Sequence, residues 1–203
     1  MTDAHTIAAS PRRARRSRWA RWWGPVAVTA VLALLAGGWP LIDSWISGDE
    51  RVRAGTVFRV GPSEDRRAWF RVGDGWTLDR GGTTPSRRFV LRHGDVDLSV
   101  SYISLQRAAD AERLWSGLRD TLLVGDPDAR LGPPRPVTAD AGARGEAGAV
   151  GRDGDTGTAV VYAGPKDTFA ISLIAVAPAD TPAVEWLPAD DVMRSLTFTE
   201  EAL

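Results

Sequence analysis

Residues 88–102 read Arg-Phe-Val-Leu-Arg-His-Gly-Asp-Val-Asp-Leu-Ser-Val-Ser-Tyr and contain the clearest local pattern of the chain. In the second half, apolar residues at positions 96, 98, 100 and 102 alternate with Asp97, Ser99 and Ser101. A period of two places apolar side chains on one face of a strand and polar side chains on the other. The stretch therefore predicts a β-hairpin with strands over 88–92 and 96–102 and a turn at His93–Gly94, and one face of its sheet must be covered.

The predicted cover is a helix over residues 108–124. Its apolar residues recur at spacings of three and four, which is typical of a helix with one buried stripe. Gly125 is a natural C-terminal stop for this helix. The stripe consists of Ala108, Ala111, Leu114, Trp115, Leu118 and Leu122.

The rest of the domain reads as short strands joined by hairpin-like turns. Pro188 suits the first turn of a final helix over 189–195, and the Pro-rich connection 127–136 is expected to cross an edge of the sheet. This order of elements favours an α+β fold in which helices pack on an antiparallel sheet. The other expected strands are 56–60, 68–72, 76–78, 143–150, 158–163 and 168–176.

These elements resemble the PsbP-like fold that bacterial extracytoplasmic proteins of the LpqN type share. The resemblance covers residues 56–198 and rests on the Gly75-Trp76 start, the hairpin, the single amphipathic helix, the later meander and the closing Val192-Met-Arg-Ser-Leu-Thr-Phe198. It implies an antiparallel sheet sandwiched by helices and a non-catalytic binding or accessory role. The LpqN type has a lipid-modified Cys that this chain lacks, so any membrane attachment must be a helix.

Residues 22–42 form an uncharged segment of 21 residues. As a helix it would be about 31 Å long, close to the thickness of a bilayer hydrocarbon core. Indole rings favour the membrane interface, and tryptophans lie at both ends of the segment. The sequence therefore predicts one transmembrane helix with interfacial anchors at Trp22, Trp23, Trp39 and Trp45.

Six arginines and one Asp in residues 1–21 give the N-terminal flank a net charge of +5. The excess of positive charge predicts a cytoplasmic N-terminus, an extracytoplasmic C-terminal domain and a signal-anchor at the cell membrane. A cleaved secretory signal is the alternative, because it shares the order of basic and apolar segments. The expected organisation is a tail 1–21, a transmembrane helix 22–42, a tether 43–55, a domain 56–198 and a tail 199–203.

Composition restricts the chemistry of the chain. It has no Cys, which excludes thiol catalysis, disulfides and Cys-zinc sites. Only two of its 203 residues are His, so few sites can use an imidazole. A serine-hydrolase site would have to combine His93 with Ser99 or Ser101 and with Asp95 or Asp97. The local sequence around His93 is also what a tight hairpin turn uses.

The acidic residues form no recognisable motif. Asp153 and Asp155 resemble part of a calcium loop, but the remaining ligands are missing, and a hairpin turn explains them. Asp126 and Asp128 follow a helix, and Asp190-Asp191 fall in the first turn expected for the last helix. Hydrolysis by paired carboxylates needs no motif and stays an alternative. No cofactor or metal is expected.

Two groups of residues are candidates for an interaction surface. Trp76 and Trp115 belong to predicted core positions, whereas Trp69 and Trp186 are less constrained. Residues 59–92 contain eight Arg and four acids, so this stretch could meet an anionic surface; mixed pairing with later acids is the alternative. The candidate surface consists of Arg66, Arg67, Arg87, Arg88, Arg92, Trp69 and Trp186.

The expected function is that of a single-pass membrane-anchored binding or accessory protein of the bacterial cell envelope, and not of an enzyme. Its expected partners are the lipid bilayer and an envelope protein or ligand. The formal net charge of −1 argues against nucleic acid. The alternatives are an envelope hydrolase that uses extracytoplasmic carboxylates and a regulator that signals through its basic tail. The Ala, Arg and Gly richness with a single Lys indicates a high-GC bacterium such as an actinobacterium.

Overall fold

The computed structural model describes residues 48–199. The predicted anchor 22–42 and its tryptophans Trp22, Trp23, Trp39 and Trp45 lie outside the described residues. Between residues 48 and 199, no helix is both long and apolar enough to cross a membrane.

The strands are β1 (Glu50–Arg51), β2 (Val57–Ser63), β3 (Arg66–Arg71), β4 (Thr77–Leu78), β5 (Arg88–His93), β6 (Val96–Ser104), β7 (Arg130–Leu131), β8 (Arg135–Thr138), β9 (Arg144–Arg152), β10 (Asp155–Ala163) and β11 (Phe169–Ala177). The helices are α2 (Ala111–Gly125), the 3-10 turn η2 (Pro165–Asp167) and α3 (Ala183–Arg194).

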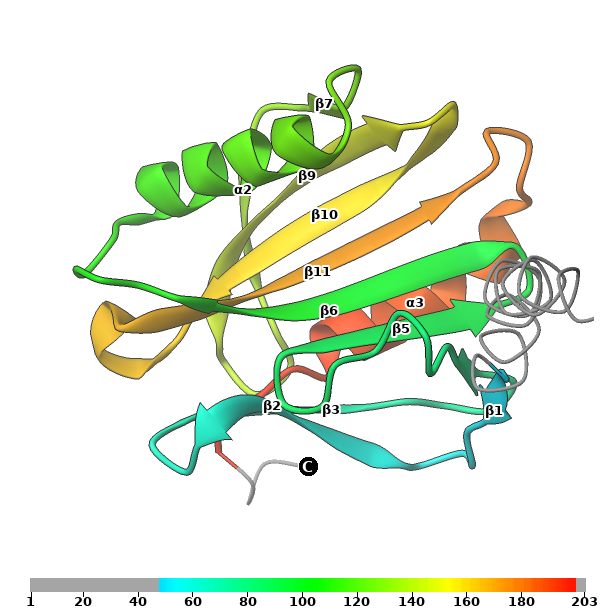
Figure 1. The fold of residues 1–203 in the computed structure, drawn as a ribbon, viewed down its shortest axis with the longest axis horizontal. Coiled ribbons are helices and arrows are strands. Elements are labelled where there is room, and N and C mark those ends of the chain that lie inside the picture. The colour runs from blue at the N-terminus through cyan, green and yellow to red at the C-terminus, as the bar shows by residue number, and fades with distance from the viewer. Residues whose placement is uncertain (1–47, 200–203) are drawn as a thin grey trace, which may run out of the picture. The chain divides into compact units, whose positions relative to one another are not determined.

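Nine strands form one antiparallel sheet, with α2 on one side and α3 on the other (Figure 1). The strands follow the order β1-β4-β5-β6-β11-β10-β9-β7, and β8 pairs with β9 beside β7. Hairpins join β5 to β6 and β9 to β10 to β11, while β6 meets β11 across a long separation in sequence. The prediction of an antiparallel sheet with helices packed on it is confirmed.

The β5–β6 hairpin has the expected strands but a turn one residue later than expected. His93 pairs with Val96, so the loop consists of Gly94 and Asp95, and His93 is the last residue of β5. Gly94 adopts a φ of +56°, in the left-handed region that glycine accepts without a steric penalty. The prediction of a His93–Gly94 turn was therefore wrong by one position.

One face of the main sheet packs against α3 and against the separate two-stranded sheet of β2 and β3, and we call it the α3 face. Leu91, Leu98 and Ile171 are fully buried there, together with Phe70 of β3 and Val192 of α3. The aromatic rings of Phe58, Phe70 and Phe89 fill the space between the two sheets, with centroids 5.1 to 5.9 Å apart. This apolar layer holds the β2–β3 hairpin on the main sheet.

Helix α2 lies over β9 and β10 on the opposite face, which we call the α2 face (Figure 1). The predicted stripe is confirmed at its centre, because Leu114, Trp115, Leu118 and Leu122 are buried. The helix begins at Ala111, later than expected, because the Asp110 side chain accepts a hydrogen bond from the Arg113 N–H and caps it. Among residues 48–199, α2 contacts β7, β9 and β10 rather than β5 and β6, and this agrees with the polar side chains on the α2 face of β6.

Helix α3 begins earlier than the sequence predicts. Pro182 precedes its first residue, Ala183, and Pro188 lies inside the helix instead of in its first turn. Asp190 and Asp191 therefore fall in the second half of α3, and Glu185 is the acid of the first turn. Pro188 costs one hydrogen bond to the carbonyl of residue 184, close to the exposed beginning of the helix. Burial of Ala189, Val192 and Met193 compensates for that loss.

Two connecting segments contribute strands. The connection 127–136 was expected to cross an edge of the sheet, whereas β7 and β8 both pair with β9, so the chain runs along that edge and extends it. Strand β1 lies inside the segment expected to be a tether, where it pairs with β4. The Val52 N–H also donates to the carbonyl of Trp76 at 2.8 Å. The ordered domain consequently starts no later than Glu50.

Candidate functional site

A groove of about 420 Å³ lies on the α2 face, between the beginning of α2 and the edge strand β8. Val161 and Ala163 of β10 and Gly145 of β9 form its floor. Leu114 of α2 and Val137 of β8 form apolar parts of its two walls. The groove therefore has an apolar interior of the kind that small ligands and peptide side chains enter.

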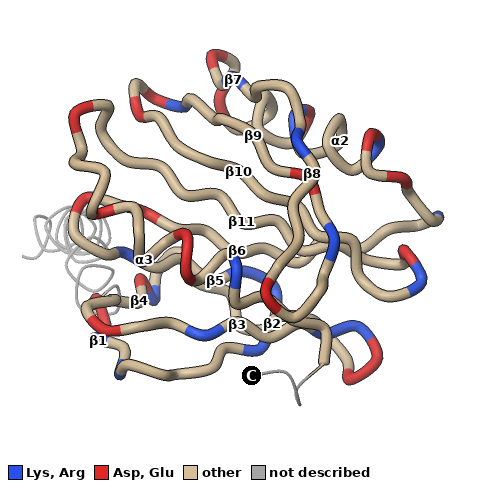
Figure 2. The backbone as a smooth tube through the Cα atoms, turned by 180° about the vertical axis from the view of Figure 1, so that it is seen from behind, with Lys and Arg blue, Asp and Glu red and all other residues tan. Residues whose placement is uncertain are grey.

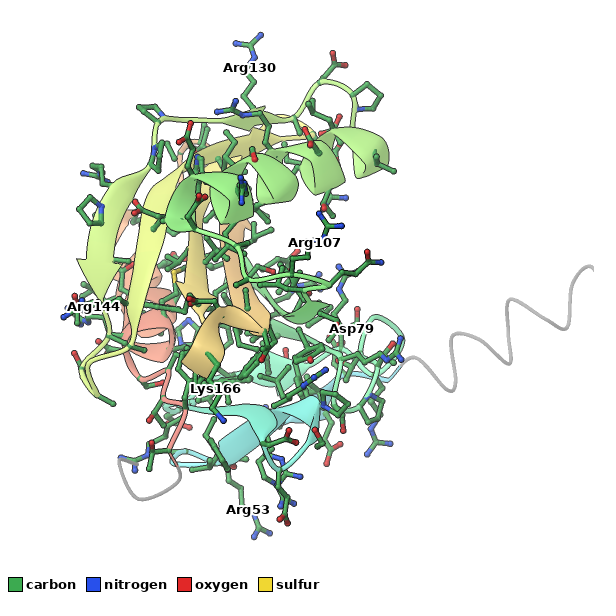
Figure 3. The ribbon with its side chains drawn as sticks, turned by 90° about the vertical axis from the view of Figure 1, so that its left-hand side faces the viewer. Arg53, Asp79, Arg107, Arg130, Arg144 and Lys166 are labelled. Atoms are coloured by element: carbon green, nitrogen blue, oxygen red, sulfur yellow. The ribbon has the colours of Figure 1, made fainter. Side chains whose placement is uncertain are left out.

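The rim of this groove contains charges of both signs. Asp110, Glu146 and Asp167 contribute carboxylates, and Arg144 contributes a guanidinium that projects at the sheet edge (Figure 3). Asp110 already uses one oxygen to cap α2. A partner that places an apolar group on the floor and polar groups at the rim would fit this arrangement.

Two features place α2 beside the groove. The indole N–H of Trp115 donates to the carbonyl of Gly132 at 3.1 Å, which ties the helix to the segment before β8. A Cβ on Gly148 would lie only 2.7 Å from the Trp115 ring, so the ring rests directly on the backbone of β9. The absence of a side chain at residue 148 thus sets how closely the helix approaches the sheet.

The five arginines of the candidate interaction surface lie in three separate places. Arg66 and Arg87 line one small pocket on the side of the β2–β3 hairpin. Arg67 lies over the ring of Trp69, with its guanidinium carbon 6.0 Å from the ring centroid, as in a cation–π contact. Around the domain as a whole, basic and acidic positions are interspersed (Figure 2).

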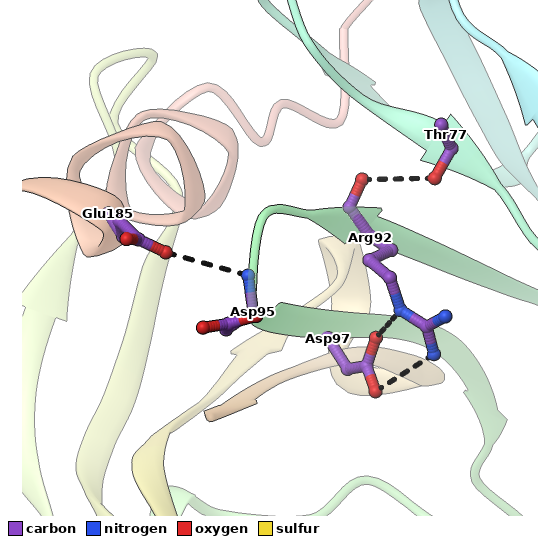
Figure 4. A network of polar contacts seen from close by, with 5 residues as sticks. All are labelled: Thr77, Arg92, Asp95, Asp97 and Glu185. Carbon is purple, nitrogen blue, oxygen red and sulfur yellow. Dashed lines mark hydrogen bonds and ion pairs between the residues drawn. The ribbon is translucent and has the colours of Figure 1, made fainter. Parts of the chain in front are cut away.

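Arg88 and Arg92 lie on the α2 face of β5. Arg92 donates to both oxygens of Asp97, at 2.7 and 3.3 Å, and this carboxylate raises the pKa of Arg92 (Figure 4). Arg88 borders a hollow of about 270 Å³ that Asp97, Asp153 and Asp155 also line. Arg92 is therefore paired with a later acid, as the alternative of mixed pairing expects, whereas Arg88 lies near acids and near Arg152 and belongs to none of the ion pairs among residues 48–199.

The four tryptophans of the predicted domain differ in their surroundings. Trp76 and Trp115 are buried in the two apolar clusters, which confirms their assignment to the core. Trp69 is also buried, at 7% exposure, whereas Trp186 on α3 is half-buried against the core. Trp69 therefore offers little surface to a partner, and Trp186 offers only part of its ring.

The geometry of β5 and β6 excludes the serine-hydrolase combination. His93 is half-buried against Trp76, with ring centroids 5.4 Å apart, and its partner in the hairpin is Val96 on the α3 face. Ser99 and Ser101 alternate with the buried Leu98 and Val100, so they point to the α2 face. Because the sheet separates them, the His93 ring cannot take a proton from either hydroxyl.

The acids singled out in the sequence have local roles. Asp155 begins β10, and Asp153 and Gly154 form the two-residue turn before it, which confirms the hairpin interpretation. The buried Asp126 accepts hydrogen bonds from the backbone N–H groups of Asp128 and Asp153. Within the described part of the chain, no group of three or more acids and histidines is arranged to hold a metal ion.

Several residues of these pockets had no signal in the sequence. Tyr102 and Ser104 lie at the C-terminal end of β6 and line the pocket with Arg66 and Arg87. In the sequence, Tyr102 is recognisable only as a residue of the apolar face of this strand. The groove beside α2 combines residues from α2, β8, β9, β10 and η2. No local pattern indicates such a combination, because it depends on how distant elements pack.

Comparison with known proteins identifies the fold. No protein-family model and no curated protein match this chain. The solution structure of the cyanobacterial PsbP (CyanoP) from Synechocystis sp. PCC 6803 matches 72% of this chain and 94% of its own, at 18% identity and a TM-score of 0.50. The Ran-binding protein Mog1p of Saccharomyces cerevisiae matches 73% of this chain and 98% of its own, at 11% identity and a TM-score of 0.45. A Bacteroides thetaiotaomicron structure matches 67% of this chain and 46% of its own, at 12% identity and a TM-score of 0.37.

The similarity to CyanoP extends over 94% of that protein. At a sequence identity of 18%, it supports a shared fold and no shared function. It agrees with the antiparallel sheet between α2 on one face and α3 on the other. The domain of this chain therefore has the PsbP-like fold.

Proposed function

We propose that this chain is a membrane-anchored binding or accessory protein of the bacterial cell envelope, and that its PsbP-like domain binds a partner through the groove beside α2. The observation that supports binding is the groove itself, which combines an apolar floor with a charged rim. Support for the anchor comes from residues 1–42, where an Arg-rich flank precedes an uncharged segment of 21 residues.

The partner that fits the groove is an extended peptide segment or a small amphipathic molecule. Pro136, Val137 and Thr138 on β8 and the exposed Ala111 on α2 border it, so apolar groups of the partner would contact residues from both walls. Arg144 and Glu146 at the rim would then favour partners that carry complementary charges. The groove supplies binding surface without any step of covalent chemistry.

Site-specific photocrosslinking in native membranes tests the groove. A photoreactive amino acid at Ala111, which lines the groove, should capture one defined partner. The matched control is Arg119, which is exposed on the same helix and does not line the groove. Equal capture from both positions, or capture from neither, would contradict binding through this groove.

The orientation of the anchor has its own test. Alkaline phosphatase is active only outside the cytoplasm, so a fusion after Leu203 should be active and a fusion after Arg21 inactive. The mature protein should also keep its N-terminal tail and stay in the membrane fraction during carbonate extraction. A soluble product that starts near Trp39 would identify a cleaved signal instead.

A further inference from the structure

A second pocket, of about 280 Å³, lies between the β2–β3 hairpin, the beginning of β5 and the C-terminal end of β6. Pro62, Arg66, Arg87, Tyr102 and Ser104 line it. It lies on a different part of the domain from the groove beside α2, and the two share no lining residue. Its chemistry therefore has to be considered by itself.

Backbone contacts hold the two arginines of this pocket near each other. The Gly61 N–H donates to the carbonyl of Ser86 at 2.7 Å, and the Tyr102 N–H donates to the carbonyl of Arg87 at 2.8 Å. Gly61 has a φ of +133°, and a Cβ at this position would collide with the backbone carbonyl of Arg66. Only glycine permits the bulge that brings β2 against Arg66 and beside Ser86.

The lining side chains are rich in hydrogen-bond donors. Each guanidinium offers a fork of N–H groups, and the hydroxyls of Tyr102 and Ser104 can each donate one more hydrogen bond. Within residues 48–199, the four ion pairs join other side chains and involve neither Arg66 nor Arg87. Both charges are thus available to a ligand as far as the described residues are concerned.

The hydroxyl of Tyr102 is buried and hydrogen-bonds to no residue between 48 and 199. Its ring is stacked on Phe169, with centroids 5.6 Å apart, and Tyr102 is one of the residues that line the pocket. A buried hydroxyl without a partner is unfavourable, and an acceptor atom bound in the pocket would remove that cost.

The surroundings add positive charge. Lys166, the only lysine of the chain, extends from η2 near the β2–β3 hairpin (Figure 3). The hydrogen bond from Ser63 is the main cause that lowers the pKa of Asp65, and the positive charges of Arg66 and Lys166 lower it further. Both cations therefore lie close enough to this end of the hairpin to act on an anion there. Asp65 itself keeps the local field from being purely positive.

We propose that this pocket binds a phosphate group, held by Arg66, Arg87 and the Tyr102 hydroxyl. Forked guanidinium groups match the oxygens of a tetrahedral oxyanion, and these charge-assisted hydrogen bonds are the strong ones. The phosphate could belong to a free phosphate compound or to the headgroup of an anionic lipid. The chemistry of recognition is the same in both cases.

The test uses the full chain in detergent or in nanodiscs. Calorimetric titration with inorganic phosphate at constant ionic strength should show binding with a Kd below about 1 mM. Arg66→Gln and Arg87→Gln should each weaken it by about tenfold, as loss of a charge-assisted contact does. Tyr102→Phe should weaken it about fivefold while leaving the thermal transition unchanged or higher, because it removes a hydroxyl without a partner. Arg130→Gln, at an exposed arginine outside the pocket, is the matched control and should bind as the wild type does.

A second arm separates the two sources of phosphate. Hydrogen exchange of the segment around Tyr102 is compared in nanodiscs of phosphatidylcholine with and without phosphatidylglycerol. Protection that needs phosphatidylglycerol and is lost in Arg87→Gln identifies a lipid headgroup, whereas a response to inorganic phosphate alone identifies a soluble ligand. Equal binding by the pocket variants and the Arg130 control, or no response in either arm, would overturn the proposal. Should an arginine variant fail to fold, Tyr102→Phe still tests the pocket: phosphate binding equal to that of the Arg130 control would overturn the proposal.

Discussion

The carboxylate of Asp126 accepts a hydrogen bond from the backbone N–H of Asp153 at 3.2 Å, although 27 residues separate them in the chain. Its other oxygen accepts from the N–H of Asp128 at 2.9 Å, and the residue is only 7% exposed. Asp126 follows directly after α2, and Asp153 begins the turn between β9 and β10. One acidic side chain therefore connects the end of the helix to the sheet that it covers.

Loss of this connection should destabilise the domain. Asp126→Ala leaves two backbone donors without their partner, so the free energy of unfolding should fall by about 1 to 3 kcal/mol. Asp128→Ala, at an exposed neighbour, should change it by less than about 0.5 kcal/mol. Urea denaturation of residues 46–203 measures both values, and equal effects would show that Asp126 has no special structural role.

The packing of α2 predicts a difference between two adjacent residues. Leu118 is 3% exposed in the apolar cluster under the helix, and Arg119 is exposed. Leu118→Ala should lower the free energy of unfolding by about 2 to 5 kcal/mol through the cavity it leaves. Arg119→Ala should stay within about 0.5 kcal/mol. Thermal denaturation that finds the two variants alike would contradict the orientation of α2.

Two glycines should respond to alanine in opposite directions. At Gly148 a Cβ would lie 2.7 Å from the Trp115 ring and 2.9 Å from the carbonyl oxygen of Pro133, so Gly148→Ala should cost about 1 to 3 kcal/mol. At Gly117, on the exposed side of α2, a Cβ meets nothing within 4 Å. Gly117→Ala should therefore stabilise the helix by about 0.5 to 1 kcal/mol. Denaturation midpoints that move in the same direction would argue against the close contact of α2 with β9.

Tyr162 should make stability depend on alkaline pH. Its hydroxyl donates to the carbonyl of Met193 at 3.1 Å, and burial raises its pKa to about 12. Since the unfolded chain releases the same proton near pH 10, this contribution to stability is complete below about pH 10 and is lost as the pH rises through 12. The loss should reach about 1 kcal/mol by pH 11.

The variant Tyr162→Phe isolates this effect. At neutral pH it should be less stable than the wild type by about 0.5 to 1.5 kcal/mol, because it lacks the hydrogen bond to Met193. Between pH 10 and 12 the wild type should lose this advantage, since only the wild type has a proton to release at this position. Parallel stability curves for the two proteins over that range would contradict a buried, protonated Tyr162.

Local patterns predicted most of the elements. The alternation at 96–102 and the stripe at 114–122 correspond to β6 and α2 because each depends on one period and one buried face. The first six residues of α3 were missed because Pro188 is a strong signal for a helix start, and burial of Val192 and Met193 overrides it. The hairpin turn was misplaced by one residue, because either position satisfies the sequence preferences of a Gly-Asp turn.

The different surroundings of Arg87 and Arg88 show why charge counting was insufficient. Both belong to the same basic stretch, yet Arg87 lies in the turn before β5 and Arg88 is the first residue of that strand. Arg87 lines the pocket with Arg66, whereas Arg88 borders the hollow on the α2 face. The sum of charges along a segment does not describe a surface, because the fold places neighbouring residues at different sites.

The sequence by itself determined what depends on neighbours along the chain: the α+β class, the hairpin of β5 and β6, the buried stripe of α2 and the absence of thiol chemistry. Only the tertiary structure decided what depends on contacts between distant segments. These are the pairing of β6 with β11, the separation of His93 from Ser99 by the sheet, and the meeting of Arg66, Arg87 and Tyr102 around one pocket. The physical reason is that a period fixes which way a side chain points within its own element, whereas packing of the apolar faces fixes which elements become neighbours.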